Sequence, residues 1–177
     1  MIQNGKDCER EAVLRIAQDL CAAIRTAPKA CGVDHLNTWV ISGEDLERLA
    51  QAMEEMAIKL DKAFFQRDAN NVRQCHAVVL VSAGKYQRGL GAACGWCGYG
   101  DCQHCAEADG ICVCEPLDLG IALGSAVALA SRQHIDNRIM FSIGKTAMAM
   151  GLTPENTAMA LGIPLSTTGK SPFFDRG

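Results

Sequence analysis

The feature that most constrains this chain is a run of six cysteines between residues 94 and 114. Their spacing is Cys94-x2-Cys97-x4-Cys102-x2-Cys105-x6-Cys112-x-Cys114. From residue 84 to 116 the sequence shows no hydrophobic periodicity, and a loop of that length is uncommon in a compact domain unless something else orders it. We therefore expect a bound metal group to order this segment.

Regular elements are predicted on both sides of the segment. Residues 9–27 carry apolar side chains at helical spacing and stop at Pro28, and the valine-rich run 75–83 is typical of a strand buried on both faces. The other predicted elements are a strand at 36–42, helices at 43–67, 117–134 and 144–152, and strands at 138–143 and 156–164. The pattern indicates mixed helix and strand structure around one irregular insertion.

Length and charge limit the class of protein. The 177 residues suffice for one domain, and we expect a single domain, 1–177, with residues 84–116 as an insertion within it. The net charge of -3 and the scattered lysines and arginines argue against nucleic-acid binding. No apolar run approaches the roughly 20 residues of a membrane span, and the start has no signal-peptide pattern. We expect a cytoplasmic protein, in which the cysteines do not form a disulfide framework.

The cysteine spacing favours an iron-sulfur cluster over a single zinc ion. A structural zinc site usually separates its two cysteine pairs by roughly a dozen or more residues, whereas four residues separate Cys97 from Cys102. The irons of a cluster lie at separate corners, so closely spaced thiolates and one distant thiolate can each bind one of them. Gly95 and Gly98 allow the backbone to turn around such a group, and His104 is an alternative metal ligand.

The first three cysteines also form a recognisable motif. The pattern Cys94-Gly95-x-Cys97-Gly98-Tyr99-x-x-Cys102 resembles the small four-iron cluster domain of corrinoid iron-sulfur proteins and of Rnf-type electron-transport subunits. Those domains continue to a fourth cysteine further along the chain. The resemblance implies that Cys112 or Cys114 takes the fourth position, with Cys105 as an additional candidate.

Four sequence blocks extend the resemblance over nearly the whole length. CGWCGYGDCQHC, DLGIALGSAVALA, DNRIMFSIGKTAM and LGIPLSTTGKSPFFDR together resemble a family of uncharacterised prokaryotic proteins that contain a ferredoxin domain. The resemblance implies one 4Fe-4S cluster per chain and no particular reaction. In that family the recurrent cysteine stands six residues before the Asp of DLGIA, which is Cys112 here. The ligands implied are Cys94, Cys97, Cys102 and Cys112, with Cys105 as the competing thiol.

The segments that flank the insertion are similar to flavin-dependent nitroreductases. An early Ala-Pro turn, a strand, a small-residue helix and a strand that ends in Gly-x-Pro follow the same order. The resemblance implies an α+β fold, with a mixed sheet packed between helices and a Cys/Gly-rich cluster-binding loop inserted into it. It also implies FMN as an alternative cofactor, with the basic candidates Arg25, Lys29, Lys170 and Arg176. The arginine-rich opening motif of nitroreductases is reduced here to Arg10 and Arg15.

Three functional hypotheses follow from the sequence. The first is an electron-transfer protein whose 4Fe-4S cluster exchanges electrons with a redox partner protein. The second is a flavin-dependent oxidoreductase with an accessory cluster, and the third is a zinc-stabilised interaction protein. Nitroreductases are typically dimers, and the helix at 117–134 offers small residues for a homodimer interface. The sequence does not assign an enzymatic reaction.

Overall fold

The computed structural model describes residues 1–174 and contains six α-helices and four strands in that range. The helices are α1 (Gly5–Thr26), α2 (Glu44–Leu60), α3 (Ala63–Arg73), α4 (Cys102–Glu107), α5 (Cys114–Arg132) and α6 (Phe141–Ala149). The strands are β1 (Leu36–Ser42), β2 (Ala77–Gly84), β3 (Asp136–Asn137) and β4 (Thr157–Ser166). Short 3-10 turns lie at Ala30–Gly32 and Gly91–Ala93.

The strands form one sheet in the order β1-β2-β4-β3. β2 lies between β1 and β4, and all eight of its residues are buried, which confirms the prediction of a strand covered on both faces. The resemblance implied a mixed sheet, but every strand pair within residues 1–174 is antiparallel.

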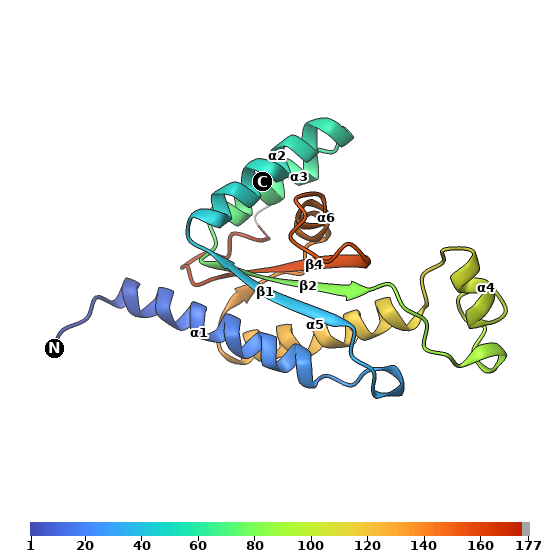
Figure 1. Cartoon of the computed structure of the whole chain (residues 1–177). Helices are drawn as coiled ribbons and strands as arrows, with labels where there is room; N and C mark the ends of the chain where they lie inside the picture. The colour runs from blue at the N-terminus through green and yellow to red at the C-terminus, as the bar shows by residue number, and fades with distance from the viewer. Residues whose placement is uncertain (175–177) are drawn as a thin grey trace.

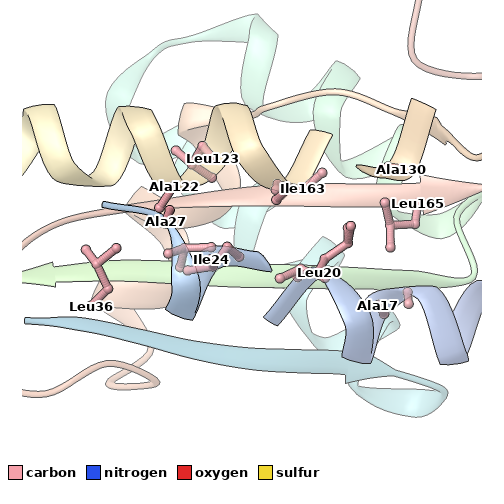
Figure 2. Close-up of a cluster of buried hydrophobic side chains, with 14 of the residues drawn as sticks. Ala17, Leu20, Ile24, Ala27, Leu36, Ala122, Leu123, Ala130, Ile163 and Leu165 are labelled. Atoms are coloured by element: carbon pink, nitrogen blue, oxygen red, sulfur yellow. The ribbon is translucent and has the colours of Figure 1, made fainter. Parts of the chain in front are cut away.

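Helices cover both faces of the sheet, as predicted (Figure 1). On one face α1 and α5 bury Leu20, Ile24 and Leu123 against the sheet residues Ile163 and Leu165 (Figure 2). On the other face α2, α3 and α6 pack around a second apolar cluster. Because each fully buried large aliphatic side chain contributes about 1.5–3 kcal/mol, these two cores are the main stabilising term, and the α+β architecture is confirmed.

All four predicted helices differ in their bounds, and α5 and α6 each begin three residues before the helices predicted at 117–134 and 144–152. α1 begins at Gly5, four residues earlier than expected, because the Asn4 side chain accepts a hydrogen bond from the Lys6 amide and caps the helix. The single helix predicted at 43–67 is wrong. The chain leaves the helix at Asp61, which has left-handed φ and ψ of 52° and 51°, and α3 then starts as a separate helix.

The strand predicted at 138–143 is also wrong. Only a single bridge, between Met140 and Gly162, joins this region to β4, and α6 starts at Phe141. Periodicity cannot separate a short buried helix from a short buried strand, so the packing of α6 against β4 decides the outcome.

The cysteine-rich insertion projects from the end of β2 and returns into α5 (Figure 1). It is largely irregular, as predicted, but contains the short helix α4, whose Asp101 cap accepts a hydrogen bond from the His104 amide at 2.9 Å. Six residues are too few to show helical periodicity in the sequence.

Helix α5 is long and apolar enough, by length and composition alone, to cross a membrane. It has 19 residues and a mean hydropathy of 1.3 in the most apolar window, of which 44% is buried inside the protein. The buried side includes Leu119, Ala122 and Ala126, which belong to the core. Core helices commonly pass such a composition test, so its apolar character is accounted for in part by this packing.

Candidate metal centre

The backbone of the insertion turns sharply after each of its first two cysteines. Gly95 and Gly98 have φ of 61° and 84°, a region in which any side chain is strained. The Gly98 amide also donates to the Gly95 carbonyl at 3.1 Å. Glycine therefore stands after Cys94 and Cys97 because the turn requires it.

The six cysteines of the insertion lie at two depths. Cys94, Cys97 and Cys102 are half-buried. Cys105, Cys112 and Cys114 are buried. Cys105 lies within α4, and Cys112 lies two residues before the start of α5. The three buried thiols are thus the ones that come last along the insertion, from α4 to the start of α5.

The thiols influence one another electrostatically. Burial raises the pKa of the Cys105 thiol, and the neighbouring Cys97 and then Cys112 raise it further. The pKa of Cys114 is raised to about 11, first by burial and then by Cys112 and Cys94. These interactions indicate that five of the six thiols share one neighbourhood. The predicted ligands Cys94, Cys97 and Cys112 are among them, together with the competing Cys105.

The sixth cysteine and the only histidine of the insertion lie outside this set of interactions. Cys102 opens α4 and is not among the main causes that raise the pKa of Cys105 or of Cys114. His104 is two-thirds exposed, and its Nδ1 lies 2.8 Å from Oδ1 of Asp101. The structure therefore pairs His104 with a carboxylate rather than with the thiols.

The donor set, six thiols on one glycine-rich loop, is of the kind that binds iron-sulfur clusters. Across residues 1–174, no three His, Cys, Asp or Glu side chains converge closely enough to hold one metal ion. A tetrahedral zinc site needs sulfurs about 2.3 Å from a common point. Thiolates around a cluster bind separate irons and stand further apart, which suits several thiols on one glycine-rich loop.

A network of charged groups that the sequence analysis missed lies beside the cysteines. The Arg88 side chain is 1% exposed, with Nη1 at 3.0 Å from Glu115 Oε1 and Nη2 at 2.6 Å from Asp118 Oδ2. Asp118 also accepts a hydrogen bond from the Ala30 amide at 3.0 Å. His35 completes the group, since its Nδ1 lies 2.8 Å from Glu115 Oε1. This cluster of Arg88, Glu115, Asp118 and His35 is called the buried network below.

Two signals in the sequence point to the buried network. Glu115 and Asp118 are the only charged residues in the first half of an otherwise apolar helix, and their three-residue spacing puts them on one helix face. Asp118 is moreover the Asp of the DLGIA block. No local pattern could have paired them with Arg88, which lies 30 residues before Asp118 in the chain.

His35 links the buried network to a polar cavity of about 260 Å³. The cavity is lined among others by Arg25, Asp34, Tyr86 and Asn156. The His35 and Tyr86 rings lie 4.1 Å apart between centroids. Solvent therefore reaches the network from the side of β1 through an imidazole that is 20% exposed.

Two of the basic residues predicted for FMN make contacts within the chain. Arg25 pairs with Asp34 and donates to the Leu36 carbonyl at 3.0 Å. The Lys29 ammonium donates to three carbonyl oxygens around the end of α1, and its side chain is 4% exposed. Both residues thus hold the turn between α1 and β1.

Lys170, another of the FMN candidates, lies away from Arg25 and Lys29 within this chain. Lys170 follows the end of β4, where Leu165 pairs with Ala77 at the start of β2. Arg25 and Lys29 precede the start of β1, where Leu36 pairs with Ala83 near the end of β2. Six residues of strand span about 20 Å, so the two groups lie at opposite ends of the sheet. Arg176 lies outside the described residues. Among the described residues, Arg25, Lys29 and Lys170 therefore do not meet at one site within a single chain.

Solved structures of a nitroreductase and of a hypothetical oxidoreductase share the fold. The nitroreductase CinD from Lactococcus lactis, in complex with nicotinic acid, aligns with a TM-score of 0.60 at 11% identity and covers 96% of this chain and 81% of its own. The hypothetical oxidoreductase YcnD from Bacillus subtilis aligns with a TM-score of 0.58 at 11% identity over 89% of this chain. The chain spans only 58% of the length of YcnD. At such identities the likeness shows a nitroreductase-like fold and no more.

Sequence relatives identify the family. Residues 108–176 match a family model described as "Uncharacterized protein containing a ferredoxin domain". A relative from Archaeoglobus fulgidus, which is itself described as uncharacterised, is 41% identical over 184 residues, covering 99% of this chain and 98% of the relative. This agrees with the family inferred from the four sequence blocks. The chain therefore belongs to the family of uncharacterised proteins that contain a ferredoxin domain.

Proposed function

We propose that this protein is an electron-transfer protein that holds one 4Fe-4S cluster in its cysteine-rich insertion. The observation that carries the proposal is that six thiols, three half-buried and three buried, lie on one glycine-rich loop. Membership of a ferredoxin-domain family supports an iron-sulfur role. A cluster of this kind supplies reversible one-electron chemistry near the protein surface.

The residues of the chain have distinct roles in this proposal. Cys94, Cys97, Cys102 and Cys112 are the four ligands, and Cys105 is the thiol that competes for a place. The turns at Gly95 and Gly98 set the direction of the backbone between the ligands. The insertion projects from the body of the protein (Figure 1), so electrons enter and leave a cluster bound there through the insertion.

The projecting side offers a surface for a redox partner protein. Trp96 is 76% exposed although it stands between two ligand cysteines, and Tyr99, Leu90 and Ile111 are also exposed. Buried aromatic anchors dominate the affinity of many interfaces, so an exposed tryptophan is a natural contact for a partner. The partner remains to be identified by its ability to exchange electrons with the loaded protein.

Charge indicates what kind of partner fits this surface. Four carboxylates and two cationic side chains lie between residues 84 and 116. Arg88 and Glu115 are buried and pair with each other, which leaves Asp101, Glu107 and Asp109 against Lys85. The surface of the insertion is therefore acidic, and we propose a partner with a basic rim around its own redox centre.

Anaerobic reconstitution tests the proposed cluster. Purified protein is incubated with ferrous iron and sulfide, and bound iron and sulfide are measured together with the electron paramagnetic resonance spectrum. The expected result is about four irons and four sulfides per chain. A Cys97→Ala variant should lose most of both, whereas Cys21→Ala, a half-buried thiol of α1, should not. A protein that takes up one zinc per chain but no sulfide would support the zinc-stabilised interaction protein instead.

A flavin-dependent oxidoreductase is the second candidate, and the nitroreductase-like fold favours it. The solved NADPH:FMN oxidoreductase from Vibrio harveyi, complexed with NAD+, aligns over 89% of this chain with a TM-score of 0.56 at 14% identity. The internal contacts of Arg25 and Lys29 weigh against these residues as phosphate ligands within a single chain. Quenching of FMN fluorescence on titration with the protein tests this candidate. If FMN stays unbound at tens of micromolar protein, the flavin-dependent oxidoreductase is ruled out.

A further inference from the structure

One guanidinium group lies between the two ends of the cysteine-rich insertion. Arg88 stands six residues before Cys94, and Glu115 directly follows Cys114, so all six clustered cysteines fall between these two residues. Within residues 1–174, the Arg88 guanidinium is the buried cation that contacts both carboxylates of the α5 start, at 3.0 Å from Glu115 and 2.6 Å from Asp118. The chain thus leaves and re-enters the body of the protein at the same point.

The junction is attached to a third segment of the chain. The Ala30 amide donates to Asp118, and Nδ1 of His35 lies 2.8 Å from Glu115, so the turn before β1 holds both carboxylates. His35 Nδ1 also contacts Nη1 of Arg88. The hydrogen bonds and ion pairs that form this junction come from groups other than the cysteine thiols.

We propose that Arg88 is a positioning residue that closes the cysteine-rich insertion before any cluster is bound. The cluster then assembles among thiols that the protein has already brought together. This inference rests on the proposed function for the identity of the bound group, but the closure of the insertion does not depend on a cluster.

Burial makes the closure strong. Glu115 is 0% exposed and Asp118 is 2% exposed, so both carboxylates need a positive partner. Removing one partner of a buried pair is strongly destabilising because the other charge stays in a medium of low polarity. Arginine suits the position because its planar group presents several donors at once, and here it reaches two carboxylates from two nitrogens. Lysine could reach only one of them at a time.

Closing the insertion lowers its conformational entropy before a cluster binds. A flexible segment of 26 residues joins Arg88 to Glu115, and holding its ends together reduces the number of conformations open to the thiols. Iron and sulfide then meet a restricted set of thiol arrangements. Without Arg88 the bound cluster itself would have to order the segment.

Pulse alkylation of the metal-free protein tests the closure directly. Protein without iron is exposed briefly to N-ethylmaleimide under anaerobic conditions, and mass spectrometry reports the labelled fraction of each cysteine. Cys105, Cys112 and Cys114 should react slowly in the unaltered protein because they are buried. Cys75, which is buried in the second core away from the insertion, serves as an internal reference for global unfolding.

Two variants separate the effect of losing the Arg88 contacts from the effect of leaving Glu115 and Asp118 buried without a positive partner. In Arg88→Met the labelling of Cys105, Cys112 and Cys114 should rise at least about tenfold, because local opening becomes more frequent, while Cys75 stays protected. The triple variant Arg88→Met, Glu115→Gln, Asp118→Asn leaves no unpaired buried charge, and its three thiols should remain reactive. In Arg88→Lys the labelling rates of the three thiols should lie between those of the unaltered protein and those of Arg88→Met.

Arg73 provides a control position outside the insertion. Arg73→Met removes a second arginine that bridges two carboxylates, Glu47 and Glu54, and should leave labelling of the insertion unchanged. Thiols as protected in the triple variant as in the unaltered protein would overturn the proposal. Equal labelling of Cys75 and of the insertion thiols in both variants would also overturn it. The buried network would then stabilise the whole protein and not the insertion alone.

Reconstitution with iron and sulfide distinguishes failure of this inference from failure of the proposed function. If the unaltered protein takes up a cluster, the triple variant should take it up several-fold more slowly. If the unaltered protein takes up none, the proposed function fails while the labelling result still decides the role of Arg88.

Discussion

A methyl group placed on Gly144 of α6 would lie 1.8 Å from the carbonyl oxygen of Ala160 in β4. The helix therefore packs directly on the backbone of the strand, and no side chain fits between them. We expect Gly144→Ala to lower the free energy of unfolding by about 2–3 kcal/mol, because a rigid backbone oxygen must move. Urea unfolding followed by circular dichroism measures the change.

Helix α5 provides the matched control for that substitution. Gly120 is also helical, and a methyl group there would meet no atom within 4 Å. Gly120→Ala should therefore stabilise the protein by about 0.5–1 kcal/mol through helix propensity. A loss of stability in Gly120→Ala similar to that in Gly144→Ala would contradict the packing argument.

The choice among the returning cysteines can be decided by three single variants. Cys112→Ala should lose most of the reconstituted iron and sulfide, because Cys112 is the proposed fourth ligand. Cys105→Ala and Cys114→Ala should retain the cluster, with a shift in its electron paramagnetic resonance spectrum, since each thiol lies near the others. Retention in Cys112→Ala together with loss in Cys105→Ala would exchange the two assignments.

Trp96 tests the proposed docking surface. The second-order rate of electron transfer from the reduced, reconstituted protein to cytochrome c, a basic haem protein, should fall about tenfold in Trp96→Ala, because truncation of a central aromatic contact typically costs more than 1 kcal/mol. Iron content should not change. Ile58, an exposed apolar residue of α2, is the control position, and Ile58→Ala should react at the unaltered rate. Equal rates for both variants would place the docking surface elsewhere.

Acid should weaken the contact between α2 and α3. Hydrogen bonds from Arg73 and then from Gln66 lower the pKa of Glu54 from its usual 4.5 to about 2. A carboxyl with a depressed pKa in the folded state stabilises the protein above pH 4.5, and this stabilisation is lost as the pH falls from 4.5 towards 2. The melting temperature of Glu54→Gln should consequently fall less between pH 7 and pH 3 than that of the unaltered protein. Glu155→Gln, at an exposed position outside this contact, should behave as the unaltered protein does.

The candidate site could be predicted from sequence where the signal is local. The six cysteines, their glycines and the irregular insertion are neighbours in the chain, so their spacing alone indicated a metal group. The buried network joins positions that are far apart in the sequence, with Ala30 and Asp118 separated by 88 residues. A polar residue in an apolar helix signals a partner, but its identity depends on which segments meet in space.

The sequence by itself determined those elements whose patterns are unambiguous. The apolar stripe of α1 and the valine run of β2 admit one structure each, because burial on one helix face and burial on both strand faces need different residue orders. Tertiary structure decided the rest. The break at Asp61 depends on how α3 packs, and the start of α6 at Phe141, three residues before the helix predicted at 144–152, depends on how α6 packs; short apolar segments take whichever form buries them best. The pairing of Arg88 with Asp118 likewise exists only because the end of β2 and the start of α5 lie side by side in the folded chain.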